Sequence, residues 1–107
     1  MHRHESETLG MISKKLHAVF GERLVAVYAF GSRVRGDYDA DSDFDVLVLV
    51  KDKNPDIEYE IISIFVDLEM AAGLSFTPVI KDIKTFEMEK AYHTPFYENI
   101  MHEGVLV

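Results

Sequence analysis

The chain has 107 residues, of which 48% are hydrophobic and 28% charged, and its formal net charge at pH 7 is −8. We therefore expect a single domain over residues 1–107, with one modest core and no room for a separate substrate-binding domain. The acidic balance argues against non-specific binding to nucleic acid or to an anionic membrane surface, since both require a basic surface. The absence of cysteine excludes disulfides and thiolate metal sites.

Residues 5–20 are predicted to form a helix, because apolar residues recur there at helical spacing, and Gly21 would end it. Residues 24–30 are short, apolar and partly β-branched, which predicts a buried strand. Residues 43–50 form the next predicted strand. Its continuous apolar run indicates that both of its faces are covered.

Residues 56–72 are predicted to form a second long helix, which Gly73 would close. A third strand is predicted over residues 74–80. Because Pro78 has no backbone N–H to donate, that strand should be irregular or lie at an edge of the sheet.

One or two short helices are predicted over residues 82–91 and 94–102, broken near Thr94 and Pro95, and an apolar tail follows Gly104. The order α-β-β-α-β-α predicts an α/β (α+β) fold, with a single small mixed sheet flanked by helices. No apolar run has the length of a membrane span, and no signal peptide is evident, so a cytoplasmic protein is expected.

The most informative segment joins the first two predicted strands. Gly31 and Ser32 follow the first strand, ten residues intervene, and Asp43 and Asp45 stand at the head of the second. Because strand side chains alternate, Asp43 and Asp45 should share one face while Phe44 points to the other. Two carboxylates on one face can hold one or two Mg²⁺ (or Mn²⁺) ions, which leave coordination positions for phosphate oxygens.

The same loop carries groups suited to a triphosphate. Gly31 allows a tight turn and lets its N–H approach a phosphate, and the Ser32 hydroxyl can donate to a phosphate oxygen. Arg33 and Arg35 are placed to neutralise phosphate charge, because a guanidinium makes forked contacts with phosphate oxygens. Each part alone is typical of a turn, a strand start or a charged surface. Their combination between two apolar strands indicates a site for a nucleoside triphosphate with its metal.

A calcium loop is the competing interpretation of this segment. Aspartates at every second position from 37 to 45 resemble the start of an EF-hand, which requires Gly at its sixth position and Glu at its twelfth. Counted from Asp37, those positions hold Ser42 and Val48, so this interpretation fails.

The Gly31-Ser32 pair, the ten-residue gap and the Asp43-Phe44-Asp45 triplet resemble the signature of the polymerase-β-like nucleotidyltransferase superfamily. More narrowly, the chain resembles a minimal nucleotidyltransferase, the small single-domain type that is often found beside a HEPN-domain partner. The resemblance implies Asp43 and Asp45 as metal ligands, and Gly31 and Ser32 as triphosphate contacts. It also implies attack by an acceptor hydroxyl on the α-phosphorus of ATP or another NTP. In some such pairs the acceptor is a tyrosine of a HEPN toxin, which makes the small protein an antitoxin.

One departure from the superfamily pattern leaves two hypotheses open. Active members usually carry a third acidic residue on the third strand, where this chain has Thr77 or Ser75. The first hypothesis is a nucleotidyltransferase that moves AMP from ATP to a hydroxyl of a partner protein. The alternative is a catalytically degraded module that keeps nucleotide and metal affinity without turnover. Transfer to a small molecule is a weaker third option, because no separate pocket is evident.

Several other residues carry plainer expectations. Asp67 and Glu69 should be solvated on the second long helix, and Tyr59 should pack in the core. His4 should belong to a mobile terminus. Phe96 is expected in the core rather than in an exposed apolar patch.

Overall fold

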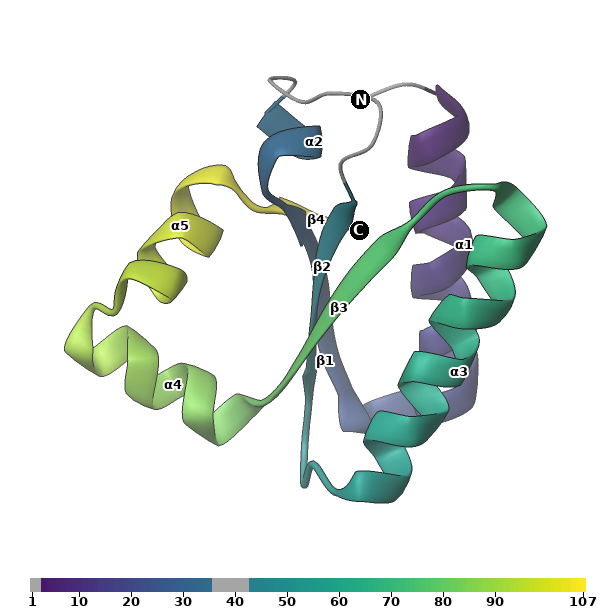
Figure 1. The fold of residues 1–107 in the computed structure, drawn as a ribbon. Helices are drawn as coiled ribbons and strands as arrows, with labels where there is room; N and C mark the ends of the chain where they lie inside the picture. Colours follow the sequence, from purple (N-terminus) through teal and green to yellow (C-terminus); the bar gives the residue numbers. More distant parts are fainter. Residues whose placement is uncertain (1–2, 36–42) are drawn as a thin grey trace.

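Four strands form one mixed sheet, in the order β3-β2-β1-β4. The computed structural model describes residues 3–35 and 43–107 (Figure 1), except for the side chains of Ser32 and Arg35. Strand β1 pairs antiparallel with both β2 and β4, whereas β2 and β3 run parallel. The strand bounds are β1 Leu24–Phe30, β2 Phe44–Val50, β3 Phe76–Asp82 and β4 Val105–Leu106.

Helices cover both faces of this sheet. The bounds are α1 Arg3–Phe20, α2 Ser32–Arg35, α3 Pro55–Ala72, α4 Ile83–Tyr92 and α5 Pro95–Glu103, with a 3₁₀ turn at Gly21–Arg23. Figure 1 shows α1 and α3 on one face and α4 and α5 on the other, with the short α2 at the end of β1. This arrangement confirms the predicted α/β class, with one mixed sheet between helices.

Strand β2 explains the continuous apolar run in the sequence, because it lies inside the sheet with helices on both sides. Phe44, Val46 and Val48 belong to the core beneath α1 and α3. Leu47 and Leu49 face the opposite way, into a second core with Phe86 and Ile100 of α4 and α5. Their side chains therefore alternate between two dry layers, which is why the hydrophobic pattern shows no period of two.

Local signals set the ends of α3 where the sequence predicted them. The Asn54 side chain accepts a hydrogen bond of 2.9 Å from the backbone N–H of Ile57, and Pro55 stands at the first helical position. Gly73 ends the helix in the left-handed conformation, with φ of 71°.

The sheet differs from the prediction at its two edges. Strand β3 begins at Phe76 rather than at residue 74 and continues to Asp82. It pairs only with β2 among the described strands, so Pro78 lies on an edge strand as predicted. Strand β4 was not predicted: Val105 and Leu106 pair with Ala29 and Tyr28. Two residues are too few to show a periodic pattern, so only the pairing with β1 defines this strand.

The surface of α3 also departs from expectation, because Tyr59 is 74% exposed and does not pack in the core. It begins a stripe of exposed apolar side chains along the outer face of α3, which we call the α3 stripe and which consists of Tyr59, Ile62, Val66 and Met70. Their spacing of three or four residues places them on one side of the helix.

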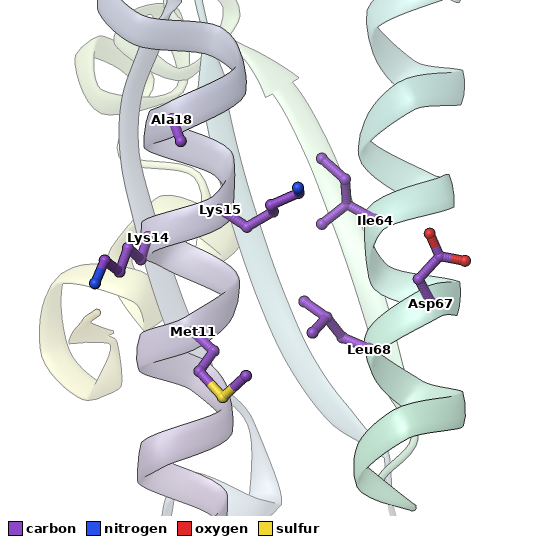
Figure 2. A pocket seen from close by; sticks show the side chains of 7 residues that line it. All are labelled: Met11, Lys14, Lys15, Ala18, Ile64, Asp67 and Leu68. Carbon is purple, nitrogen blue, oxygen red and sulfur yellow. The ribbon is translucent and has the colours of Figure 1, made fainter.

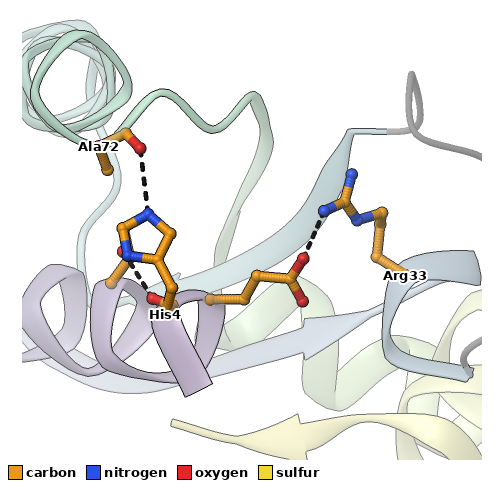
Figure 3. A network of polar contacts seen from close by, with 5 residues as sticks. His4, Arg33 and Ala72 are labelled. Atoms are coloured by element: carbon orange, nitrogen blue, oxygen red, sulfur yellow. Dashed lines mark hydrogen bonds and ion pairs between the residues drawn. The ribbon is translucent and has the colours of Figure 1, made fainter. Parts of the chain in front are cut away.

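The expectation that His4 belongs to a mobile terminus is wrong. His4 lies in the first turn of α1, and its Nε2 is 3.1 Å from the carbonyl oxygen of Ala72 at the end of α3 (Figure 3).

Among the residues that the structure describes, none of the helices combines the length and the apolar character needed to cross a membrane.

Candidate functional site

The candidate site lies where three strands meet at one end of the sheet. Because β1 and β2 are antiparallel, the last residue of β1, Phe30, is opposite Asp45. Because β2 and β3 are parallel, Asp45 is also in register with Thr77. The fold thus brings Gly31, Asp45 and Thr77 together from segments that are distant in the sequence.

Asp43 and Thr77 are in direct contact. The Thr77 hydroxyl donates a hydrogen bond of 3.1 Å to Oδ2 of Asp43. Next to this contact, the backbone N–H of Phe44 donates a hydrogen bond of 2.9 Å to the carbonyl oxygen of Ser75. Thr77 is therefore a residue of β3 that lies directly beside Asp43, and both side chains are exposed to solvent.

Gly31 fits closely against Asp45. Its φ of +87° is a conformation that residues with a side chain rarely adopt. A Cβ placed on Gly31 would collide with the Oδ2 atom of Asp45, so the half-buried carboxylate lies directly against the glycine backbone. The glycine is needed here both for its conformation and for the space that Asp45 fills.

We expect Gly31→Ala to lower the free energy of unfolding by about 1–3 kcal/mol, because strained backbone costs that much and the new Cβ also displaces Asp45. Denaturant unfolding measures the change. Gly10→Ala is the matched control, since Gly10 lies in α1 with no atom near its Cβ position and should be unchanged or stabilised. A Gly31→Ala variant as stable as its parent would contradict the close fit between Gly31 and Asp45.

Arg33 is placed differently from the sequence expectation of a phosphate contact. Its Nη2 donates a hydrogen bond of 2.6 Å to Oε1 of Glu5, and the two side chains are only 10% and 7% exposed. Figure 3 shows the Arg33 guanidinium directed toward the first turns of α1. Its Cζ also lies 4.5 Å from the centre of the Phe44 ring. Glu5 went unnoticed in the sequence because nothing local links it to a residue 28 positions away.

Three other carboxylates, on α3 and β3, do not join Asp43 and Asp45 in the part of the chain that the structure describes. Glu69 is not simply solvated, since its Oε1 accepts a hydrogen bond of 2.7 Å from the backbone N–H of Phe76. Asp82 stands at the opposite end of β3 from the site and caps α4. Its pKa is held below the usual range by hydrogen bonds from the backbone N–H groups of Lys53 and Lys84. Asp67 is exposed on α3.

The donor set at the site fits a hard divalent cation in its chemistry. Asp43 and Asp45 supply carboxylate oxygens and leave room for water and phosphate oxygens. Within residues 3–35 and 43–107, no third His, Asp or Glu joins them to complete a metal-binding group. The Ser32 hydroxyl, the Arg35 guanidinium and the aspartates between 37 and 41 were also considered from the sequence, and they lie outside the described part of the chain.

A groove of about 610 Å³ lies between α1 and α3, on the face of the sheet opposite to Asp45. Figure 2 shows Lys15 and Ile64 pointing into it from the two helices. Its walls are mainly apolar, and neither Asp43 nor Asp45 lines it. The candidate metal ligands are therefore separate from this groove.

Known proteins resemble this chain in sequence and in fold. Residues 14–107 match the sequence model of the family described as "Polymerase beta, Nucleotidyltransferase". The chain is 31% identical over 103 residues to a Methanocaldococcus jannaschii protein named "Putative protein adenylyltransferase", with 94% of this chain and 96% of the relative covered.

Solved structures show the same fold. One is described as a minimal nucleotidyltransferase and superposes with a TM-score of 0.60 at 23% identity, covering 96% of this chain and 91% of the other. Another is a chain of a toxin–antitoxin crystal structure with AMP-PNP, with a TM-score of 0.55 at 19% identity, covering 90% and 69%.

Proposed function

Because the chain belongs to the polymerase β nucleotidyltransferase family, we propose that it transfers AMP from ATP to a hydroxyl group of a partner protein. The observation that carries this proposal is the meeting of Gly31, Asp43 and Asp45 at one end of the sheet. Members of this family generally use a divalent metal. We assign that role to Mg²⁺ or Mn²⁺, held by Asp43 and Asp45.

In this reaction the acceptor oxygen forms a bond to the α-phosphorus of ATP. The bond from the α-phosphorus to the oxygen that bridges it to the β-phosphate breaks, and pyrophosphate leaves with that electron pair. The cation, when bound, neutralises the phosphate charge that builds up during the displacement. Thr77 offers no base at pH 7, so the proton of the acceptor hydroxyl passes to solvent, which reaches the exposed side chains of Asp43 and Thr77.

The chain's own residues position the nucleotide. Gly31 follows β1 directly, where its backbone N–H can approach the triphosphate, and the sequence adds Ser32 and Arg35 as candidate contacts. Asp45 is fixed in place by its close fit to Gly31. Asp43 is oriented by the hydrogen bond from Thr77.

A protein acceptor is supported by three observations. The relatives are named as protein adenylyltransferases, and one structural neighbour is a toxin–antitoxin pair with AMP-PNP. The α3 stripe also leaves an apolar surface exposed, with Tyr59 and Met70 at 74% and 83%, and such surfaces are typical of protein interfaces. We propose a HEPN-type partner, with this chain as its antitoxin in the cytoplasm.

A second function is favoured by one specific observation, the hydroxyl of Thr77 in place of a third carboxylate. In that case the chain binds nucleotide and metal and acts through its partner without turning over. Calorimetry with Mg-ATP would then show binding, and labelled nucleotide would stay unchanged.

Incubation of the purified chain with α-³²P-ATP, Mg²⁺ and the protein encoded by the neighbouring gene tests the proposal. We expect the α-label to become covalently attached to the partner, with one pyrophosphate released for each AMP transferred. A control with γ-³²P-ATP should leave the partner unlabelled, because the γ-phosphate departs. Binding of Mg-ATP without label transfer, with either Mg²⁺ or Mn²⁺, would support the second function instead.

A further inference from the structure

We propose that Glu5 and Arg33 form a positioning pair for the two aspartates, and that Arg33 acts through Phe44 rather than by contacting phosphate. This inference rests on the proposed function only in that the site it orients is the nucleotide and metal site described above. It assigns to α1, which supplies none of the site residues, a part in setting the geometry of that site.

The first step of the argument is the burial of the pair. Arg33 follows Gly31 and Ser32 directly, yet its side chain is only 10% exposed and donates a hydrogen bond of 2.6 Å to Glu5. A guanidinium that reached a phosphate would have to leave this buried carboxylate. Since an unpaired buried charge is costly, the paired position is the stable one.

The second step is the contact between Arg33 and Phe44. The guanidinium lies over the Phe44 ring with its Cζ 4.5 Å from the ring centre, a distance typical of a cation–π interaction. An arginine is suited to this arrangement because its flat guanidinium can bind a carboxylate and lie on an aromatic ring together. Glu5 therefore holds Arg33 in place, and Arg33 in turn holds Phe44.

The third step links Phe44 to the chemistry. Phe44 is fully buried and stands between Asp43 and Asp45, so a shift of its backbone moves both carboxylates. Its ring also packs against Phe76, with centroids 5.8 Å apart, and Phe76 directly precedes Thr77. Phe44 is thus fixed between Arg33 on one side and strand β3 on the other.

The test combines Glu5→Gln, Arg33→Met and the double variant with two measurements. The first measurement needs no nucleotide. It is the hydrogen-exchange rate of the Phe44 amide, which donates a hydrogen bond to the carbonyl oxygen of Ser75, relative to the rate of a β1 amide such as that of Val27. We expect exchange at Phe44 to rise about tenfold relative to Val27 in each single variant, and no further in the double, because the residues act as one unit.

The second measurement is the affinity for Mg-ATP by calorimetry. We expect Glu5→Gln and Arg33→Met to weaken binding by a similar factor of about ten, and the double variant by no more than either. A direct phosphate contact gives a different result: Arg33→Met weakens binding while Glu5→Gln leaves it at the parental value. That outcome, or unchanged exchange at Phe44, overturns the inference. If the parent chain does not bind Mg-ATP, the proposed function fails, and the exchange measurement still decides whether the pair positions Phe44.

Two further variants separate positioning from general stability. Glu7→Gln removes an exposed ion pair with Arg3 on the same helix, and it should change neither measurement. Arg33→Lys keeps the positive charge but cannot lie flat on the Phe44 ring, so it should restore only part of the lost protection at Phe44. If Arg33→Met prevents folding, Glu5→Gln and Arg33→Lys still test the inference.

Discussion

Replacing Asp43 by Asn is expected to remove the metal-dependent part of nucleotide binding and to lower AMP transfer at least about 100-fold. A metal ion supplies several kcal/mol of charge stabilisation in the transition state, and each 1.4 kcal/mol is about tenfold in rate. Asn keeps an oxygen that can accept the hydrogen bond from Thr77, so the fold should be retained. Calorimetry of ATP binding with and without Mg²⁺ measures the loss.

The same substitution should have the opposite effect on the chain without metal. Asp43 and Asp45 are expected to repel each other on one face of β2, so neutralising one leaves the melting temperature unchanged or raises it. Mg²⁺ should raise the melting temperature of the parent and not that of the variant. Glu60→Gln is the matched control, because it removes one exposed carboxylate from α3 and should keep the full response to Mg²⁺. An equal response to Mg²⁺ in Asp43→Asn and its parent would disprove the assignment of Asp43 as a ligand.

Replacing Thr77 by Asp is expected to increase transfer by about tenfold or more, because it places a third carboxylate in register with Asp45 and beside Asp43. Without metal, the added charge should lower the melting temperature, and Mg²⁺ should restore it. Initial rates of α-label transfer and melting curves at several Mg²⁺ concentrations measure both effects.

Thr77→Val provides the control for this change, since it has the shape of threonine without the hydroxyl. It should lose the hydrogen bond to Asp43 and gain no activity. A fall in transfer in Thr77→Asp would mean that the native hydroxyl already serves the reaction. A gain would mean that the native site lacks only the carboxylate.

Much of the fold could be predicted from local patterns. The apolar runs at 24–30 and 43–50 became β1 and β2 with bounds within one residue, because both strands are buried and short. The prediction that Phe44 points to the opposite face from Asp43 and Asp45 was correct for Phe44, which lies in the core beneath α1. The prediction of Phe96 as a core residue also holds, as its ring packs edge-on against Phe30 at 5.6 Å.

The errors share a physical cause. Strand β4, the contact of His4 with Ala72 and the hydrogen bond from Phe76 to Glu69 each depend on a partner that no local pattern indicates. Tyr59 was misplaced for a related reason. The sequence does not show whether an apolar residue on a helix faces the core or the solvent. Among the described residues, no other element covers the side of α3 that carries Tyr59.

The sequence by itself determined the chemistry available to this protein. Three features can be read directly from the sequence, because they depend only on residue types and on the alternation of side chains along a strand. They are the glycine turn, its spacing to Asp43 and Asp45, and the absence of a carboxylate from residues 74–80. The tertiary structure decided which residues meet. Parallel pairing of β2 and β3 put Thr77 beside Asp43, and the packing of α1 buried Arg33 against Glu5. Such contacts join segments tens of residues apart, and only the packed sheet and helices hold them together.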